Sequence, residues 1–274
     1  MELENKVCFI AGASGAIGSA VAERFRREGA KLAITYFSKQ PKLIPAQKET
    51  DSRSSEFVLD VSCREQVQDV VRGAIEKFGR IDVLVNCTGV LGPIGPTAGV
   101  VAEEWVRAIH VNLAGSFYLT QAVLPTMLAH SGGKIIHFSG GGAAYARPFY
   151  TAYSASKAAL VRFTESIAEE LRESRIDVNA IAPGPVYSRM WDQMRDAGEK
   201  GGTGNLEELR RMEETGGVPP ERAANLALFL ASERSNGLTG RLISAAYDNW
   251  AALEGRIPEL MKSEAATLRR VPLA

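Results

Sequence analysis

The feature that most constrains this chain is a regular alternation of short apolar runs with longer segments of helical periodicity. The runs have no polar face, which is typical of strands that are covered on both sides of a sheet. Seven of them are expected to form strands, at residues 6–12, 31–36, 56–61, 81–86, 133–139, 176–183 and 241–246. The helical segments lie between these strands, at residues 16–28, 63–78, 102–130, 151–173 and 219–232.

This alternation predicts the fold class. Strands joined by helices run parallel, because each helix carries the chain back to the edge where the previous strand began. We therefore expect an α/β fold: a doubly wound, Rossmann-type, seven-stranded parallel sheet with helices on both faces. No change of composition marks a second domain, so residues 1–250 are expected to form one domain. Residues 251–274 form a C-terminal extension that shapes the substrate pocket or a subunit interface, or simply frays.

Two polar segments interrupt the alternation. Residues 38–55 contain two prolines and are expected to form a loop. Residues 192–218 carry many charges and six glycines. That segment has two interpretations, a disordered surface loop or a mobile substrate lid over about 187–218. The lid interpretation follows from its place after the sixth strand, because ligands of open α/β sheets bind at the carboxyl ends of the strands.

Charge and apolar content exclude several classes of function. The 32 basic residues equal the 32 acidic ones, so no nucleic-acid surface is expected. No run of about 18 apolar residues predicts a membrane span, and the N-terminus lacks a secretory h-region. The cysteines at 8, 63 and 87 are far apart and lack metal-ligand spacing. We expect reduced core thiols in a cytoplasmic protein, and no metal site.

A glycine-rich turn joins the first strand to the first helix. Small residues there let the backbone approach a pyrophosphate, and the helix N-terminus offers free N–H groups to it. The alternative is a tight turn that binds nothing. The residues expected at the cofactor are Gly12, Ser14, Gly15, Ile17 and Gly18.

The end of the second strand bears on the choice of cofactor. Dinucleotide sites usually have a carboxylate there for the adenosine ribose hydroxyls, but the sequence near Tyr36 has none. Ser38 and Lys39 suit a 2′-phosphate, which favours NADP(H) and leaves NAD(H) possible, although Lys39 also fits a solvated loop. Asp60, followed by Val61, either accepts from the adenine amino group or caps the next helix.

Tyr153 and Lys157 are the candidate catalytic pair. Their spacing places both side chains on one face of a helix, one turn apart. An ammonium beside a phenol favours the phenolate and lowers its pKa, which makes tyrosine usable as a general acid or base. Such pairs are common on helix surfaces, but this one directly follows the fifth strand of a dinucleotide-binding pattern. That place favours a catalytic role.

With these motifs the sequence resembles the classical short-chain dehydrogenase/reductase family, from about residue 4 to residue 244. The resemblance rests on the ordered motifs 12–18, Asp60, Asn86-Cys87-Thr88-Gly89, Asn112, Tyr153-Ser154-Ala155-Ser156-Lys157 and Ala182-Pro183-Gly184-Pro185-Val186. It implies an NAD(P)-dependent oxidoreductase that interconverts a small-molecule carbonyl and an alcohol by hydride transfer. It also implies a homodimer or homotetramer.

The resemblance further implies a role for each matching residue. Tyr153 exchanges the proton with the substrate oxygen, Lys157 binds the nicotinamide ribose and lowers the pKa of Tyr153, and Asn112 holds a water of a proton relay. The residues implied to line the cofactor are Asn86, Gly89, Pro183, Gly184, Val186 and Ser188.

Several departures from the family pattern matter. The family's catalytic serine lies thirteen residues before the tyrosine, which is Gly140 here, whereas Ser139 is one residue early. Either the glycine run lets Ser139 reach the substrate oxygen, or another group polarises that oxygen. The glycine spacing of the first turn is also typical of sugar-nucleotide epimerases and dehydratases. Residues 245–250 replace the family's usual ending, which puts a tetramer in doubt.

Aromatic and apolar residues, with one cation, lie beside the expected pocket. They either contact a medium-sized substrate or belong to the core or an interface. The candidates are Tyr145, Arg147, Tyr150, Tyr187, Met190 and Trp191. Two alternatives to a carbonyl reductase stay open: a sugar-nucleotide epimerase or dehydratase, and a dinucleotide-binding protein without catalysis.

Overall fold

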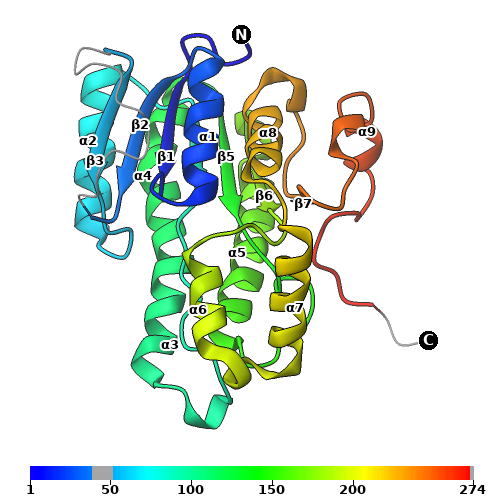
Figure 1. Ribbon diagram of the computed structural model, residues 1–274. Helices are drawn as coiled ribbons and strands as arrows, with labels where there is room; N and C mark the ends of the chain where they lie inside the picture. Colours follow the sequence, from blue (N-terminus) through cyan, green and yellow to red (C-terminus); the bar gives the residue numbers. More distant parts are fainter. Residues whose placement is uncertain (39–51, 272–274) are drawn as a thin grey trace.

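The computed structural model describes residues 1–38 and 52–271, and its centre is a seven-stranded parallel sheet (Figure 1). The strand order is β3-β2-β1-β4-β5-β6-β7. The strands are β1 (Val7–Ala11), β2 (Lys31–Tyr36), β3 (Ser54–Val58), β4 (Val83–Asn86), β5 (Gly133–Phe138), β6 (Ile176–Ala182) and β7 (Leu242–Ser244). The predicted fold class is confirmed, with β3 beginning and ending earlier than expected and β7 shorter.

The helices pack on both faces of the sheet (Figure 1). They are α1 (Ala16–Arg27), α2 (Arg64–Phe78), α3 (Ala102–Ile109), α4 (Gly115–Ala129), α5 (Thr151–Glu170), α6 (Arg189–Ala197), α7 (Gly202–Thr215), α8 (Pro220–Ala231) and α9 (Ile257–Leu260). The expected helical region at 102–130 is divided into α3 and α4 by a π-helical turn, His110–Ala114. No helix in the described part of the chain is long and apolar enough to cross a membrane.

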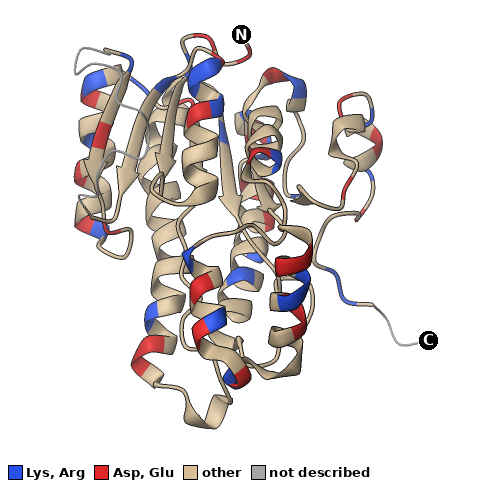
Figure 2. Cartoon of the chain, viewed as in Figure 1, with Lys and Arg blue, Asp and Glu red and all other residues tan. Residues whose placement is uncertain are grey.

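Side chains of β1 show why the central strands are apolar throughout. Cys8 and Ile10 pack in the core beneath α1 and α8, whereas Phe9 and Ala11 pack in the core beneath α2, α4 and α5. A strand buried on both faces has no position for a solvated side chain. Figure 2 agrees, because most charged residues lie on the helices and few on the central strands.

The strand order fixes the place of the site. β1 pairs with β2 on one side and with β4 on the other, so Ala11 lies opposite both Thr35 and Asn86. The chain winds away from β1 in opposite directions in the two halves of the sheet. A crevice opens outside the carboxyl ends of strands at such a switch point, which is where ligands bind in open α/β sheets.

Residues 192–218 are helical, so the interpretation as a disordered loop is wrong. α6 and α7 project beyond the carboxyl edge of the sheet (Figure 1). Trp191 and Met194 of α6 pack against Leu209 and Met212 of α7 in a small separate core. Most of the glycines lie at helix ends, and Gly216 terminates α7 in the left-handed conformation. The many glycines of this segment therefore suggested a loop, whereas most of them lie at the ends of two helices.

The C-terminal extension is anchored to the edge of the sheet. The N–H of Leu242 in β7 donates to the carbonyl of Ala266 at 2.8 Å. The guanidinium of Arg241, which is buried, donates to the main-chain carbonyls of Leu260, Ser263 and Ala265. Free sheet edges invite pairing with another chain. The extension covers this one, and through residue 269 it is held against the domain rather than frayed.

Candidate active site

The turn after β1 forms a cradle without side chains. Gly12 has a φ of +82°, and a Cβ on it would lie 3.1 Å from the main chain of Cys87 and Thr88. A Cβ on Gly18 would lie 2.3 Å from the carbonyl oxygen of Gly12. Gly15 is the N-cap of α1, and no side chain caps the helix. The free N–H groups and bare backbone fit a pyrophosphate.

The other residues expected at this turn are close to the same crevice. Ile17 lines the cleft described below. Ser14 lies in the turn itself, one residue before the N-cap, and is partly buried. The turn thus fits the dinucleotide that the sequence predicts.

The end of β2 contains a buried phenol. Tyr36 is 9% exposed, and its hydroxyl has no hydrogen-bond partner in the described residues. Burial raises the pKa of Tyr36 to about 12, with a smaller contribution from Glu56. Ser38 is exposed, and Lys39 lies outside the described residues.

Asp60 is held in a local turn. Its carboxylate accepts hydrogen bonds from the N–H of Ser62 at 2.9 Å and from the hydroxyl of Ser62 at 2.6 Å. The N-cap of α2 is Cys63, so the helix-capping interpretation of Asp60 is wrong. Val61 packs at the start of α4, since a Cβ on Gly115 would lie 2.9 Å from its methyl group.

Asn86 orders the turn that follows β4. Its amide nitrogen donates to the hydroxyl of Ser116 at 2.8 Å. Its carbonyl oxygen accepts from the N–H of Thr88 at 3.0 Å and from the hydroxyl of Thr88 at 2.6 Å. The same turn brings Gly89 near the catalytic pair, because a Cβ on Gly89 would lie 3.2 Å from Nζ of Lys157.

Asn112 lies in the π-helical turn and is fully buried. It accepts from the N–H of Val90 at 2.8 Å, donates to the carbonyl of Val90 at 2.9 Å and donates to the hydroxyl of Ser156 at 2.9 Å. Its side chain therefore ties the loop after β4 to α5, directly below Lys157. π-helical turns are frequent at functional sites.

Tyr153 and Lys157 lie on the buried face of α5, as predicted. Nζ of Lys157 donates to the carbonyl of Phe138 at 2.8 Å and lies 5.8 Å from the centroid of the Tyr153 ring. Burial lowers the pKa of Lys157 to about 8. Burial also raises the pKa of Tyr153 to about 12, and the cation that opposes this rise is Arg147.

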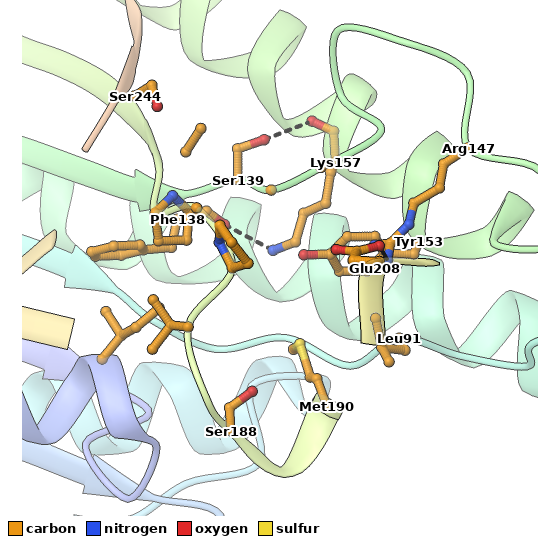
Figure 3. Close-up of a pocket in the computed structure, with 18 of the residues that line it drawn as sticks. Leu91, Phe138, Ser139, Arg147, Tyr153, Lys157, Ser188, Met190, Glu208 and Ser244 are labelled. Atoms are coloured by element: carbon orange, nitrogen blue, oxygen red, sulfur yellow. Dashed lines mark hydrogen bonds and ion pairs between the residues drawn. The ribbon is translucent and has the colours of Figure 1, made fainter. Parts of the chain in front are cut away.

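The Ser139 hydroxyl makes its hydrogen bond to the main chain of α5 and not to the phenol of Tyr153. The Ser139 hydroxyl is buried and donates to the main-chain carbonyl of Lys157 at 3.4 Å (Figure 3). The residue facing Tyr153 is Gly140, since a Cβ there would lie 2.2 Å from Oη of Tyr153. The position expected to carry the serine is thus the one that faces the tyrosine, and it carries no side chain.

Ser139, Gly140, Tyr153 and Lys157 line one cleft of about 380 Å³ at the carboxyl edge of the sheet. Among the described residues, the predicted catalytic and cofactor-binding residues that do not line it are Gly12, Ser14, Gly15, Gly18, Tyr36, Ser38, Asp60, Val61, Asn86, Gly89 and Asn112. The loop after β6 forms part of its wall through Pro183, Gly184, Val186 and Ser188. Gly184 has a φ of +81°, and a Cβ on it would meet the side chain of Ala246 at 2.7 Å. The cleft therefore joins the loop after β6 to the segment after β7.

Four of the six predicted substrate residues line this cleft: Tyr145, Arg147, Met190 and Trp191. The other two, Tyr150 and Tyr187, are not among the described residues that line the cleft. Tyr150 is buried behind the wall, where its hydroxyl donates to Oδ1 of Asn205 at 2.5 Å. Tyr187 is 43% exposed, and its ring packs edge-on against Trp191 with the centroids 5.9 Å apart.

Sequence reasoning missed several residues of the wall. Glu208 and Arg211 enter it from α7, more than fifty residues after Tyr153, and Ser244, Tyr247 and Asp248 enter it after β7. Cys87 and Thr88 also line it. The helical spacing of Glu208 and Arg211 was a usable signal for one shared face. Nothing local indicated that this face lies over Tyr153.

In the described part of the chain, no group of three His, Cys, Asp or Glu side chains is placed to hold a metal ion.

Comparison with known proteins places this geometry in a family. The family model described as enoyl-(acyl carrier protein) reductase matches residues 12–245. A 3-oxoacyl-[acyl-carrier-protein] reductase, FabG of Thermotoga maritima, is 35% identical over 245 residues, which are 89% of this chain and 97% of that protein.

Two solved structures share the fold over most of their length. NAD⁺-bound xylitol dehydrogenase superposes with a TM-score of 0.78 at 25% identity, covering 89% of this chain and 98% of its own. Actinorhodin polyketide ketoreductase with NADPH has a TM-score of 0.78 at 26% identity, covering 87% and 95%. These relatives share oxidoreductase chemistry on alcohols and carbonyls, so the chain acts as an NAD(P)-dependent oxidoreductase that interconverts the two. It belongs to the classical short-chain dehydrogenase/reductase family.

Proposed function

We propose that Tyr153 is the general acid and base of this oxidoreductase. The observation that carries the proposal is the position of its phenol, buried in the cleft one helical turn from Lys157 and in front of Gly140. In the direction of reduction, Tyr153 gives its proton to the substrate oxygen. The nicotinamide, when bound, supplies the hydride.

Lys157 and Asn112 support that step. In this proposal the ammonium of Lys157 stabilises the phenolate that Tyr153 becomes and binds the nicotinamide ribose. Its support is that Nζ of Lys157 lies 5.8 Å from the centroid of the Tyr153 ring. Asn112 holds the loop after β4 against α5 and so fixes the floor of the site. The water relay implied by the family remains a proposal for Asn112.

Of the two interpretations of the displaced serine, we favour the one in which Ser139 does not reach the substrate oxygen. Its hydroxyl is turned toward the main chain of Lys157. Ser139 then acts in positioning α5 against the end of β5. Another group must polarise the substrate oxygen.

The cofactor would be held by the turn at Gly12–Gly18, by Asn86 and Gly89, and by the loop from Pro183 to Ser188. We propose a preference for NADP(H). Its support is the end of β2, where the described residues Tyr36, Phe37 and Ser38 present no carboxylate to the adenosine ribose. Lys39 stays a proposed phosphate ligand. The relatives include both an NAD⁺-bound and an NADPH-bound structure.

The substrate would be a small carbonyl compound or alcohol with a ring or an apolar body. Met190 and Trp191 support this, because they contribute apolar surface to the cleft beside Tyr153. We further propose that α6 and α7 act as a lid over it, since both helices contribute to the wall from beyond the sheet edge. The comparisons do not favour an epimerase, a dehydratase or a protein without catalysis.

We propose a homo-oligomer in the cytoplasm, built through α4 and its neighbours. Phe117 and Leu128 of α4 support an interface, since they are 41% and 49% exposed although large and apolar. The extension covering β7 argues for a dimer over a tetramer.

Two measurements test the proposed function. The first is a fluorescence titration with NADPH and, separately, NADH, in which NADPH should bind more tightly. The second is turnover of cyclic and aromatic ketones by the wild type and by Tyr153→Phe. The variant should bind NADPH normally and lose about 10²- to 10⁴-fold in kcat. A variant that turned over ketones at the wild-type rate would exclude Tyr153 as the proton donor.

A further inference from the structure

The residues in front of Tyr153 have no side chain that could supply a hydroxyl. Gly140, Gly141 and Gly142 follow β5, and the hydroxyl of Ser139 is engaged with the carbonyl of Lys157. Within the described residues, the end of β5 therefore gives the substrate oxygen no side-chain donor beside Tyr153. Fixed hydrogen-bond donors aimed at the oxygen that gains negative charge stabilise the transition state of hydride addition.

A partly buried guanidinium lies in the same wall. Arg147 is in the loop between β5 and α5, and its side chain is 15% exposed. Its Nη2 is 2.6 Å from Oε2 of Glu208 and 3.6 Å from the sulfur of Met194. Its guanidinium carbon is 4.1 Å from the centroid of the Tyr150 ring. A guanidinium held by an ion pair and an aromatic face keeps one orientation.

The opposite edge of this guanidinium is available. Among the described residues, Nη1 of Arg147 has no hydrogen-bond acceptor, and it lies 3.9 Å from the point that a Cβ on Gly141 would occupy. The corresponding point on Gly140 is 2.2 Å from Oη of Tyr153. Nη1 of Arg147 therefore faces Gly141, and the phenol of Tyr153 faces the neighbouring Gly140. Figure 3 shows both side chains at one end of the cleft.

We propose that Arg147 is a catalytic residue of this enzyme. Its Nη1 donates a hydrogen bond to the substrate oxygen that exchanges a proton with Tyr153, in place of a serine hydroxyl. Glu208 is a positioning residue that holds the guanidinium in the orientation this requires. The inference rests on the proposed role of Tyr153 and adds the second donor to it.

The chemistry balances without a further reactant. In reduction, the hydride forms the new C–H bond, and the π pair of the carbonyl moves onto oxygen. That oxygen takes the phenolic proton of Tyr153, which is left as a phenolate to be reprotonated from solvent. Arg147 forms and breaks no covalent bond; its N–H stabilises the negative charge while it develops. A fixed donor in a desolvated site costs no reorganisation at that moment.

Tyr145 is the nearest rival for this role. Its hydroxyl lies 2.9 Å from the point that a Cβ on Gly141 would occupy. However, Tyr145 is 66% exposed, so water competes for its hydroxyl and its ring is not fixed. Arg147 is better shielded and held from two sides.

The test compares Arg147→Gln, Arg147→Lys and Tyr145→Phe in the full chain, with cyclohexanone, acetophenone and NADPH as probes. Arg147→Gln should lose about 10²- to 10³-fold in kcat, the cost of removing one fixed donor. NADPH affinity should not change. Arg147→Lys should recover part of the loss, and Tyr145→Phe should lose little. Arg195→Gln is the matched control, because Arg195 pairs with Asp192 on the exposed face of α6, outside the cleft.

Two further measurements separate chemistry from folding. Guanidinium ion at millimolar concentration should restore turnover to Arg147→Ala, whereas urea should not. Ultraviolet difference spectra, with Tyr153→Phe as the reference, should show Tyr153 ionising at higher pH in Arg147→Gln than in the wild type. A loss of activity caused by misfolding alone would give neither result.

The outcomes distinguish this inference from the proposed function. Full activity in Tyr153→Phe would remove the proton donor and the proposal built on it. An inactive Tyr153→Phe together with a fully active Arg147→Gln would overturn only the role of Arg147. So would an inactive Arg147→Ala that guanidinium does not rescue, or unchanged ionisation of Tyr153 in Arg147→Gln. If Tyr145→Phe alone lost activity, Tyr145 would be the donor.

Discussion

The hydroxyl of Tyr153 occupies the space that a side chain on Gly140 would fill, with Oη only 2.2 Å from the position of the missing Cβ. The contact explains why this chain has glycine at that position, since a side chain there and the present place of the phenol are incompatible. It also means that the active site is built around a glycine rather than merely lacking a serine. The compensating donor must then come from elsewhere in the wall.

Gly140→Ala should lower kcat because its methyl group displaces the phenol of Tyr153. The φ of Gly140 is outside the left-handed region, so the cost comes from the contact and not from backbone strain. Steady-state kinetics should show a loss of at least about tenfold, which corresponds to about 1.4 kcal/mol of the barrier. Gly204→Ala is the control, because a Cβ there meets nothing within 4 Å; it should keep full activity. Equal activity in both variants would show that Tyr153 moves away from Gly140 during turnover.

Lys157→Met should abolish turnover and raise stability near neutral pH. The pKa of Lys157 is lowered from 10.5 to about 8 by burial, so the charged form destabilises the folded state below pH 8. That shift corresponds to about 3 kcal/mol of folding free energy. The gain in stability is smaller by the contribution of the hydrogen bond to Phe138, which the variant loses. As pH rises from 8 to about 10.5 the folded protein holds a neutral amine while the unfolded chain stays protonated, so the wild type gains stability relative to the variant.

Urea unfolding at a series of pH values measures this difference directly. Lys77→Met, a change at an exposed lysine of α2, should leave the pH profile of unfolding unchanged. If the difference in the free energy of unfolding between wild type and Lys157→Met stayed constant from pH 7 to about pH 10.5, the lowered pKa of the buried Lys157 would be contradicted.

Ser38→Asp should weaken NADPH binding selectively. A carboxylate at the end of β2 repels a 2′-phosphate, and since Ser38 is exposed the charge is not buried. The Kd for NADPH should rise by at least about tenfold, or 1.4 kcal/mol, while that for NADH stays within experimental scatter. Ser131→Asp adds the same charge beside the opposite edge of the sheet, before β5, and should change neither. An equal loss for both cofactors would place Ser38 away from the phosphate.

Asn205→Ala should loosen the packing of α6 against α7. Asn205 is buried and accepts from the hydroxyl of Tyr150 at 2.5 Å, and it donates to the carbonyls of Met194 and Gly198. The variant leaves the Tyr150 hydroxyl unpaired, at a cost of about 1–3 kcal/mol. Hydrogen exchange should therefore accelerate in α6 and α7 but not in β1 or β5, and KM should rise more than kcat falls. Glu207→Ala, at an exposed position of α7, should change neither. Unchanged exchange in α6 and α7 would show that other contacts hold these two helices in place.

Sequence periodicity was sufficient for the architecture. Each of the seven apolar runs overlaps one of the seven strands. The central strands are buried on both faces and have no other composition open to them, whereas the edge strands β3 and β7 are only partly buried. The turn from Gly12 to Gly18 and the pair Tyr153 and Lys157 were also readable, since each is a local pattern of fixed spacing. The segment at 192–218 was not, because its glycines end helices and local composition does not distinguish a cap from a loop.

The sequence alone determined that this chain forms a Rossmann-type sheet with a dinucleotide turn and a tyrosine–lysine pair, and it showed that no serine stands thirteen residues before the tyrosine. Only the tertiary structure decided what surrounds that tyrosine. It turned Ser139 toward Lys157, set Gly140 against the phenol, and brought Glu208 of α7 onto Arg147 from 61 residues away. The reason is physical: spacing along the chain fixes which side chains share one helix or strand. Contacts between distant segments depend on how α6 and α7 pack beyond the edge of the sheet.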